Sequence, residues 1–140
     1  MPAKLRYGRE RAAIGIAVLN CMRVMRNTHL PKVALGELGD LLFVGFHVFI
    51  GHAHGRPQTV AALSHSLELS RATVARRLKR LIELGVVERE GVLYYMTERI
   101  NQMARDALQA HMRSLQAAIV DAEAALKMAE IVARSQQPNG

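Results

Sequence analysis

The pattern of hydrophobic and polar positions between residues 59 and 96 predicts two short helices followed by a two-stranded ribbon. Thr59 and Ser70 are suitable N-caps for the two helices, because a hydroxyl oxygen can accept a hydrogen bond from a free N–H group of the first turn. Residues 68–69 form a tight turn between the helices. Apolar residues recur at helical spacing on one face of each helix: Val60, Leu63 and Leu67 in the first, and Val74, Leu78, Leu81 and Ile82 in the second.

The ribbon follows Gly85, which is suited to end the second helix because glycine adopts the left-handed conformation easily. Residues 86–89 and 92–96 are rich in β-branched and aromatic residues, and Glu90-Gly91 lies between them. The predicted hairpin is short, and Arg89 is its one basic residue. A helix, a turn, a second helix and a short hairpin follow one another in a winged helix-turn-helix, so we expect that fold between residues 31 and 97.

The second helix has five basic residues and no acidic residue up to position 80: Arg71, Arg76, Arg77, Lys79 and Arg80. Small residues keep its first turns slim, as a helix must be to enter the major groove of DNA. We therefore predict a DNA-binding surface, with an ordinary solvated face as the alternative. The residues expected nearest base edges are Ser70, Arg71, Ala72, Thr73 and Arg76. Those expected near phosphates are Arg77, Lys79, Arg80 and Arg89, with Thr59 at a helix N-terminus beside the DNA backbone.

The segment SRATVARRLKRLIELGVVERE, followed by a strand that ends in YYMTERI, resembles the winged-helix repressors of the multiple-antibiotic-resistance-regulator (MarR) type. The resemblance extends over residues 33–110. It implies a homodimer whose terminal helices pair and whose two recognition helices enter successive major grooves. An Asp-x-Arg element and a longer basic tip, both usual in the wings of that family, are absent here. Contact between this short wing and DNA is therefore left open.

One long helix is predicted over residues 98–134, because no glycine or proline interrupts its apolar pattern. Apolar residues recur every three or four positions: Ile100, Met103, Ala107, Leu108, Leu115, Ala118, Ile119, Ala122, Leu126 and Ala129. At about 1.5 Å per residue the helix would reach roughly 50 Å, longer than so small a domain can cover. We predict that the stripe pairs with a second copy through Leu108, Leu115, Ile119, Ala122 and Leu126. The alternative is that the N-terminal helix folds back and buries it within one chain.

The rest of the chain is also predicted to be helical, so the expected fold class is mainly α, with long N- and C-terminal dimerisation helices beside the winged helix-turn-helix. Residues 1–30 comprise a basic arm and a helix over residues 9–26. Residues 36–52 form an apolar helix whose uninterrupted run is too short to span a membrane. We expect this helix to be buried beneath the helix-turn-helix. Residues 135–140 are expected to form a flexible tail.

Composition agrees with a nucleic-acid partner. The 140 residues include 19 Lys and Arg against 12 Asp and Glu, a net charge of +7, which favours an anionic partner such as nucleic acid or a membrane surface. Residues 1–30 hold six basic residues against one acidic residue, so much of the excess lies in the arm and first helix. The single cysteine fits a reducing compartment, and no signal peptide is evident, so we expect a cytoplasmic protein without a membrane partner.

Two other kinds of site are considered. Cys21 lies among apolar residues, which favours a buried core cysteine over an oxidant-sensing thiol. His52 and His54 form the one close histidine pair, but no carboxylate or cysteine accompanies them at ligand spacing, so we expect no metal site and no cofactor. The sequence has no phosphate-binding loop, nucleophile elbow or paired acids on a recognisable scaffold, so we do not expect an enzyme.

These features predict a sequence-specific, double-stranded DNA-binding regulator of transcription that acts as a homodimeric repressor on a pseudo-palindromic operator. Two alternatives stay open. One is a winged-helix module for protein interaction, whose basic face is incidental. The other is a regulator that responds to a metal or to oxidation. A small-molecule effector, the operator sequence and the regulated genes are not specified by the sequence.

Overall fold

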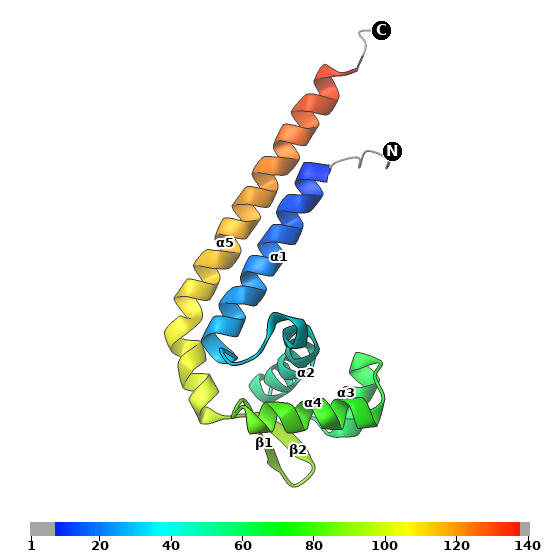
Figure 1. The fold of residues 1–140 in the computed structure, drawn as a ribbon, viewed down its shortest axis with the longest axis vertical. Helices are drawn as coiled ribbons and strands as arrows, with labels where there is room; N and C mark the ends of the chain where they lie inside the picture. Colours follow the sequence, from blue (N-terminus) through cyan, green and yellow to red (C-terminus); the bar gives the residue numbers. More distant parts are fainter. Residues whose placement is uncertain (1–7, 138–140) are drawn as a thin grey trace. The chain divides into compact units, whose positions relative to one another are not determined.

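The computed structural model describes residues 8–137, in which five helices and two strands follow one another (Figure 1). Their bounds are α1 Gly8–His29, α2 Leu35–Ala53, α3 Val60–Leu67, α4 Arg71–Glu83, β1 Val87–Glu90, β2 Leu93–Met96 and α5 Glu98–Ser135. The mainly α fold with a hairpin directly after the helix-turn-helix is therefore confirmed. Residues 1–7, which make up most of the predicted basic arm, lie outside the described residues.

The chain divides into two compact units. One consists of residues 26–107 and contains the helix-turn-helix and the hairpin. The other consists of residues 1–25 and 108–140, and so contains most of α1 and of α5. This first unit includes the first turns of α5, and the domain boundary expected at residue 97 stays a prediction.

The core of the first unit lies between α2, α3, α4 and β2, which pack against one another. Its buried apolar side chains come from each of these elements: Leu38, Leu41, Val44 and Val48 from α2, Leu63 from α3, Val74, Leu78 and Leu81 from α4, and Tyr94 and Met96 from β2. The predicted apolar faces of α3 and α4 therefore supply the core. Three of the predicted residues are less buried: Val60 and Leu67 of α3 are half-buried, and Ile82, at the margin of the α4 stripe, is exposed.

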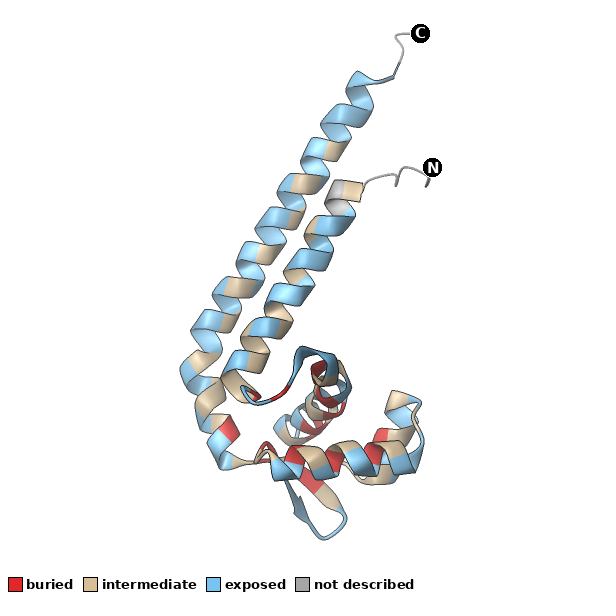
Figure 2. Ribbon diagram, in the orientation of Figure 1, coloured by how far each residue is buried: buried red, intermediate tan, exposed pale blue. Residues whose placement is uncertain are grey.

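Helix α2 is less buried than expected. One face packs under the helix-turn-helix, but its other face carries Phe43, Phe46 and Phe49, all of them exposed, with Phe43 at 64%. The ribbon of α2 accordingly shows both buried and exposed residues (Figure 2). The predicted packing of this helix under the helix-turn-helix is present, but it involves one face only, because an uninterrupted apolar run does not reveal that the other face lacks a partner. Among the described residues no helix is long and apolar enough to cross a membrane.

In the second unit, α1 lies beside α5 (Figure 1). Its described side chains are half-buried or exposed, and none is fully buried. Helix α1 covers one stripe of α5 that includes Ser114, Ala118 and Ala122, all half-buried. The neighbouring stripe stays open, since Leu115 and Ile119 are more than half exposed. Folding back of α1 therefore accounts for only part of the apolar surface of α5.

Candidate nucleic-acid interface

The two predicted N-caps are confirmed. Thr59 Oγ1 accepts a hydrogen bond from the backbone N–H of Ala62 at 3.2 Å and begins α3. Ser70 Oγ accepts one from the backbone N–H of Thr73 at 3.1 Å and begins α4. The Ser70 hydroxyl also donates to Thr73 Oγ1 at 2.8 Å. The first turn of α4, where base contact was predicted, is thus held in a defined conformation before any ligand binds.

The turn between α3 and α4 is tight and contains a residue in an unfavourable backbone conformation. Glu68 ends α3 with φ 53° and ψ 39°, in the left-handed region that side chains with a Cβ atom rarely adopt. Backbone bonds hold it there, from Glu68 N–H to the carbonyl of His65 at 3.3 Å and from Leu69 N–H to the carbonyl of Ser64 at 3.2 Å. The Ser64 hydroxyl also donates to the Leu69 carbonyl. The turn thereby fixes the angle between the two helices.

The basic residues of α4 fall into two groups. Arg71, Arg76 and Lys79 are exposed, and Arg76 and Lys79 lie on the side away from the buried stripe, beside the small residues Ala72 and Ala75. No ion pair is formed by these three side chains within the described part of the chain. They leave a slim, positively charged surface on the first three turns of α4, which suits entry into a major groove.

The second group is paired with α2. Arg77 Nη2 lies 3.1 Å from Asp40 Oδ1, and the Arg77 side chain is only 17% exposed. Arg80 Nε donates to Glu37 Oε1 at 2.9 Å, and its Nη1 lies 3.9 Å from Glu83 Oε2. The hydrogen bond and negative charge of Glu37 raise the pKa of Arg80. Contact of Arg77 and Arg80 with phosphates stays a prediction, and both arginines are engaged with carboxylates in this structure.

The wing is a two-stranded antiparallel hairpin in which Val87 pairs with Met96 and Glu90 with Leu93. The connecting residues are therefore Gly91 and Val92, one position later than expected. Gly91 has a φ of 61° whereas Val92 has no positive φ, as in a type II′ turn. Arg89 Nε donates to the Gly91 carbonyl at 2.6 Å, so the one basic side chain of the wing is folded over its own turn.

Two side chains, one just before α5 and one in its first turn, close the C-terminal end of α4. Gly85 follows the helix with a φ of 70°, as its predicted capping role requires. The Arg99 guanidinium donates to the carbonyls of Leu84 at 2.9 Å and Gly85 at 3.1 Å, and Thr97 Oγ1 donates to the Gly85 carbonyl at 2.7 Å. Sequence reasoning missed these contacts, although a basic residue beside free helix carbonyls is a known signal.

The histidines and the cysteine occupy structural positions. His52 Nδ1 accepts a hydrogen bond from the backbone N–H of Met96 at 3.0 Å, and its ring meets that of Tyr95 edge-on at 5.3 Å. His52 therefore joins the end of α2 to β2, while His54 is exposed at the C-cap of α2. Within residues 8–137 no three metal-ligating side chains come together. Cys21 is a free thiol on α1 and is half-buried rather than buried as expected.

Comparison with known proteins agrees with this geometry. Residues 52–91 match the family model for the IclR helix-turn-helix domain. The fold is similar to the crystal structure of RV1404 from Mycobacterium tuberculosis, with a TM-score of 0.52 and 18% sequence identity over 79% of this chain and 74% of that one. A search of curated proteins finds no match. The matched segment contains α3, α4 and the first strand of the wing, so the chain contains a helix-turn-helix DNA-binding domain of a transcriptional regulator; β2 completes the wing beyond the match.

Proposed function

We propose that this chain is a MarR-type repressor that binds a pseudo-palindromic operator in double-stranded DNA as a homodimer. The observation that carries the proposal is the exposed, unpaired basic surface of α4, which begins at a capped and slim first turn. In a helix-turn-helix, the N-terminal residues of the second helix contact base edges while the first helix crosses the backbone. The exposed first turn of α4 and the capped N-terminus of α3 support this assignment of the two helices.

We assign the contacts according to exposure and position on α4. The first turn and the residue one turn further face the base edges: Ser70, Arg71, Ala72, Thr73 and Arg76. Lys79 lies further along the same exposed face and is assigned to a phosphate. Thr59 places the N-terminus of α3 beside the DNA backbone, where free N–H groups favour an anion. Arg89 would have to leave the Gly91 carbonyl before it could bind a phosphate.

The homodimer is supported by a heptad stripe on α5 whose large side chains are exposed, while Ala122 at its edge is half-buried beside α1. Its members follow one another at alternating intervals of four and three residues: Leu108, Met112, Leu115, Ile119, Ala122 and Leu126. The five large side chains among them are each between 49% and 57% exposed. Met112 completes the repeat and was absent from the predicted set. We call this stripe the seam. Its spacing allows a second helix to pack against it by knobs-into-holes contacts.

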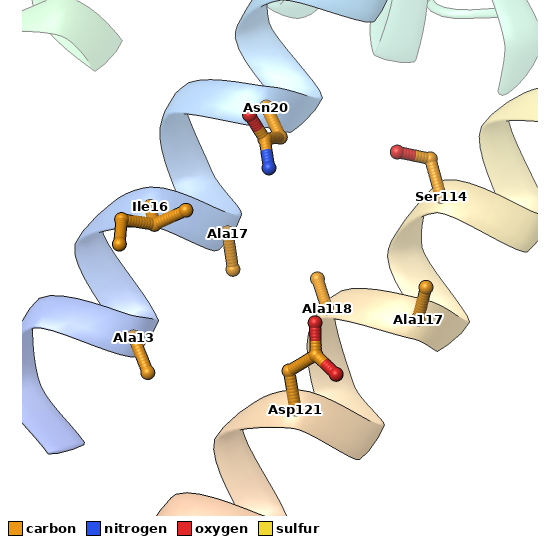
Figure 3. Close-up of a pocket in the computed structure, with 8 residues that line it drawn as sticks. All are labelled: Ala13, Ile16, Ala17, Asn20, Ser114, Ala117, Ala118 and Asp121. Carbon is orange, nitrogen blue, oxygen red and sulfur yellow. The ribbon is translucent and has the colours of Figure 1, made fainter.

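A shallow cavity between α1 and α5 offers matching holes. It measures about 260 Å³, and its apolar lining consists of four small side chains, Ala13 and Ala17 from α1 and Ala117 and Ala118 from α5, together with Ile16 (Figure 3). Asn20, Ser114 and Asp121 lie at its polar margin. Holes lined by alanine accept large apolar side chains from a neighbouring helix. We infer that the seam and the cavity belong to one dimer interface, formed by α1 and α5 of both copies.

A module for protein interaction is the second candidate, and the exposed phenylalanines of α2 favour it. The two functions differ in their response to salt. A DNA-binding surface releases counterions, so the logarithm of its affinity falls with the logarithm of salt concentration, whereas an interaction module that does not bind DNA would show little binding to a random duplex.

Selection of bound sequences from a random duplex pool tests the proposal. We expect an enriched palindrome with half-sites about one helical turn apart, because two linked recognition helices read successive major grooves. Enrichment of a single half-site would contradict the dimer, and the absence of any enrichment would contradict sequence-specific binding. The single variants Arg71→Ala and Arg76→Ala, both at exposed positions, should each weaken the preference at one position of the selected sequence and retain the helix content of the wild type.

A further inference from the structure

Arg80 has two possible anionic partners, the carboxylate of Glu37 and a DNA phosphate. This inference rests on the proposed binding of DNA by α4. Its side chain is 40% exposed, so solvent and ligands can reach it. It lies one turn beyond Arg76, on the edge of α4 that turns towards α2. In the free protein its guanidinium is bound by Glu37 from α2, with Glu83 a more distant neighbour on α4 itself.

A guanidinium cannot serve both partners with the same N–H groups. The Nε donor of Arg80 is used by Glu37 Oε1 at 2.9 Å, and that donor belongs to the fork that binds carboxylates and phosphates in two-pronged fashion. Both members of the pair are partly exposed, at 40% and 39%, and exposed ion pairs are weak enough to exchange partners. A phosphate brought close to α4 would therefore compete with Glu37 for Arg80.

The neighbouring pair differs from this one. Arg77 is only 17% exposed and lies on the side of α4 that packs towards α2, so its pairing with Asp40 positions the helix and does not withhold a charge from the surface. Of the two pairs, Glu37 with Arg80 is the one placed to exchange with a ligand.

We propose that Glu37 competes with DNA phosphates for Arg80 and so limits the sequence-independent affinity of the α4 surface. Binding to DNA of any sequence comes almost entirely from contacts with phosphates. Each phosphate contact makes the fall of log affinity with log salt concentration steeper by about 0.9 on duplex DNA. Sequence preference depends on the difference between specific and non-specific affinity. Glu37 lowers the phosphate contribution and leaves Arg71 and Arg76 free to contact bases. It therefore increases the difference between specific and non-specific affinity. Glu37 is therefore a specificity-determining residue that acts through Arg80.

The test measures binding of the full chain to a random-sequence duplex over a series of salt concentrations. The variants are Glu37→Gln, Glu37→Ala, Arg80→Gln and the double variant Glu37→Gln with Arg80→Gln. Asp106→Asn is the control, because it removes one negative charge from an exposed position on α5 and leaves the Arg80 pair intact. Far-ultraviolet circular dichroism confirms that each variant is folded, and Glu37→Ala provides a second route if the glutamine variant is not.

We expect Glu37→Gln and Glu37→Ala to bind random duplex several-fold more tightly than Asp106→Asn, with a salt slope steeper by about 0.9. The gain should vanish in the double variant, because it depends on Arg80. A slope for the Glu37 variants equal to that of Asp106→Asn would overturn the inference while leaving the proposed function intact. A gain that persists without Arg80 would overturn it as well. Failure of the wild-type chain to bind any duplex would remove the proposed function and the inference together.

Discussion

Two glycines of α2 should respond in opposite ways to the same substitution. A Cβ atom added at Gly51 would lie 2.7 Å from the carbonyl oxygen of Arg56 and 3.1 Å from Cγ of Gln58, whereas one added at Gly45 would meet nothing within 4 Å. The Arg56 backbone cannot easily retreat, because its N–H donates to the Gly51 carbonyl at 2.8 Å. The Gln58 carbonyl is also held, by the backbone N–H of Tyr94 at 3.1 Å. Gly51→Ala therefore forces a collision between backbone segments.

The size of the effect follows from two terms. Alanine stabilises a helix interior by about 0.5–1 kcal/mol relative to glycine, and both sites lie in the same helix. Overpacking of a closely packed site costs about 1–3 kcal/mol. Gly45→Ala should therefore raise the free energy of unfolding, and Gly51→Ala should lie about 1–3 kcal/mol below it, because the helix-propensity term is similar in the two variants.

Urea denaturation followed by tyrosine fluorescence measures this difference. The chain has no tryptophan, and Tyr94 and Tyr95 lie in the same unit as both glycines. Because Gly51 holds the loop that leads to Thr59, Gly51→Ala should also weaken duplex binding, while Gly45→Ala should leave it unchanged. Equal shifts of the urea midpoint in the same direction would refute the assigned contact between Gly51 and the loop.

Three further predictions concern the seam, the bases and the turn. The double variant Leu115→Glu with Ile119→Glu places two charges in the proposed seam. Sedimentation should then show a monomer, and its binding to the operator should be weaker. A wild-type chain that is already monomeric at micromolar concentration would contradict the seam. Arg76→Ala should cost about 1–3 kcal/mol at the selected operator and blur one position, and an equal loss on random duplex would argue against base contact. Glu68→Gly should raise the free energy of unfolding by up to about 1 kcal/mol in urea melts, because glycine avoids the left-handed penalty, and Glu68→Ala should not.

The helix-turn-helix could be predicted from the sequence because its signals are local. The two caps act on N–H groups three residues ahead, at Ala62 and Thr73, and the apolar faces of α3 and α4 follow from spacing alone. The hairpin was predicted one residue out of place at its turn. Glycine is favoured at the first central position of a type II′ turn, so Gly91 rather than Glu90 begins the connection.

The features that sequence reasoning missed depend on contacts between distant residues. Arg80 and Glu37 are 43 positions apart, and Arg99 reaches back to Leu84 across the whole wing. Nothing in the periodicity of α4 distinguishes an arginine that pairs with α2 from one that stays free. For the same reason the sequence alone assigned Arg77 and Arg80 to phosphates together with Lys79, and that assignment stays a prediction.

The low burial of the unit formed by α1 and α5 links its stability to the proposed dimer. None of its described side chains is fully buried, while large apolar residues such as Ile16, Leu115 and Ile119 are half exposed or more. Two paired helices with so little buried surface cannot offset the conformational entropy that they lose on folding. A second copy seated on the heptad stripe would supply the missing core, so association and folding of this unit would be one process. The melting temperature of this unit should then depend on protein concentration. The unit of residues 26–107 has its own buried core, so its melting temperature should not change with protein concentration.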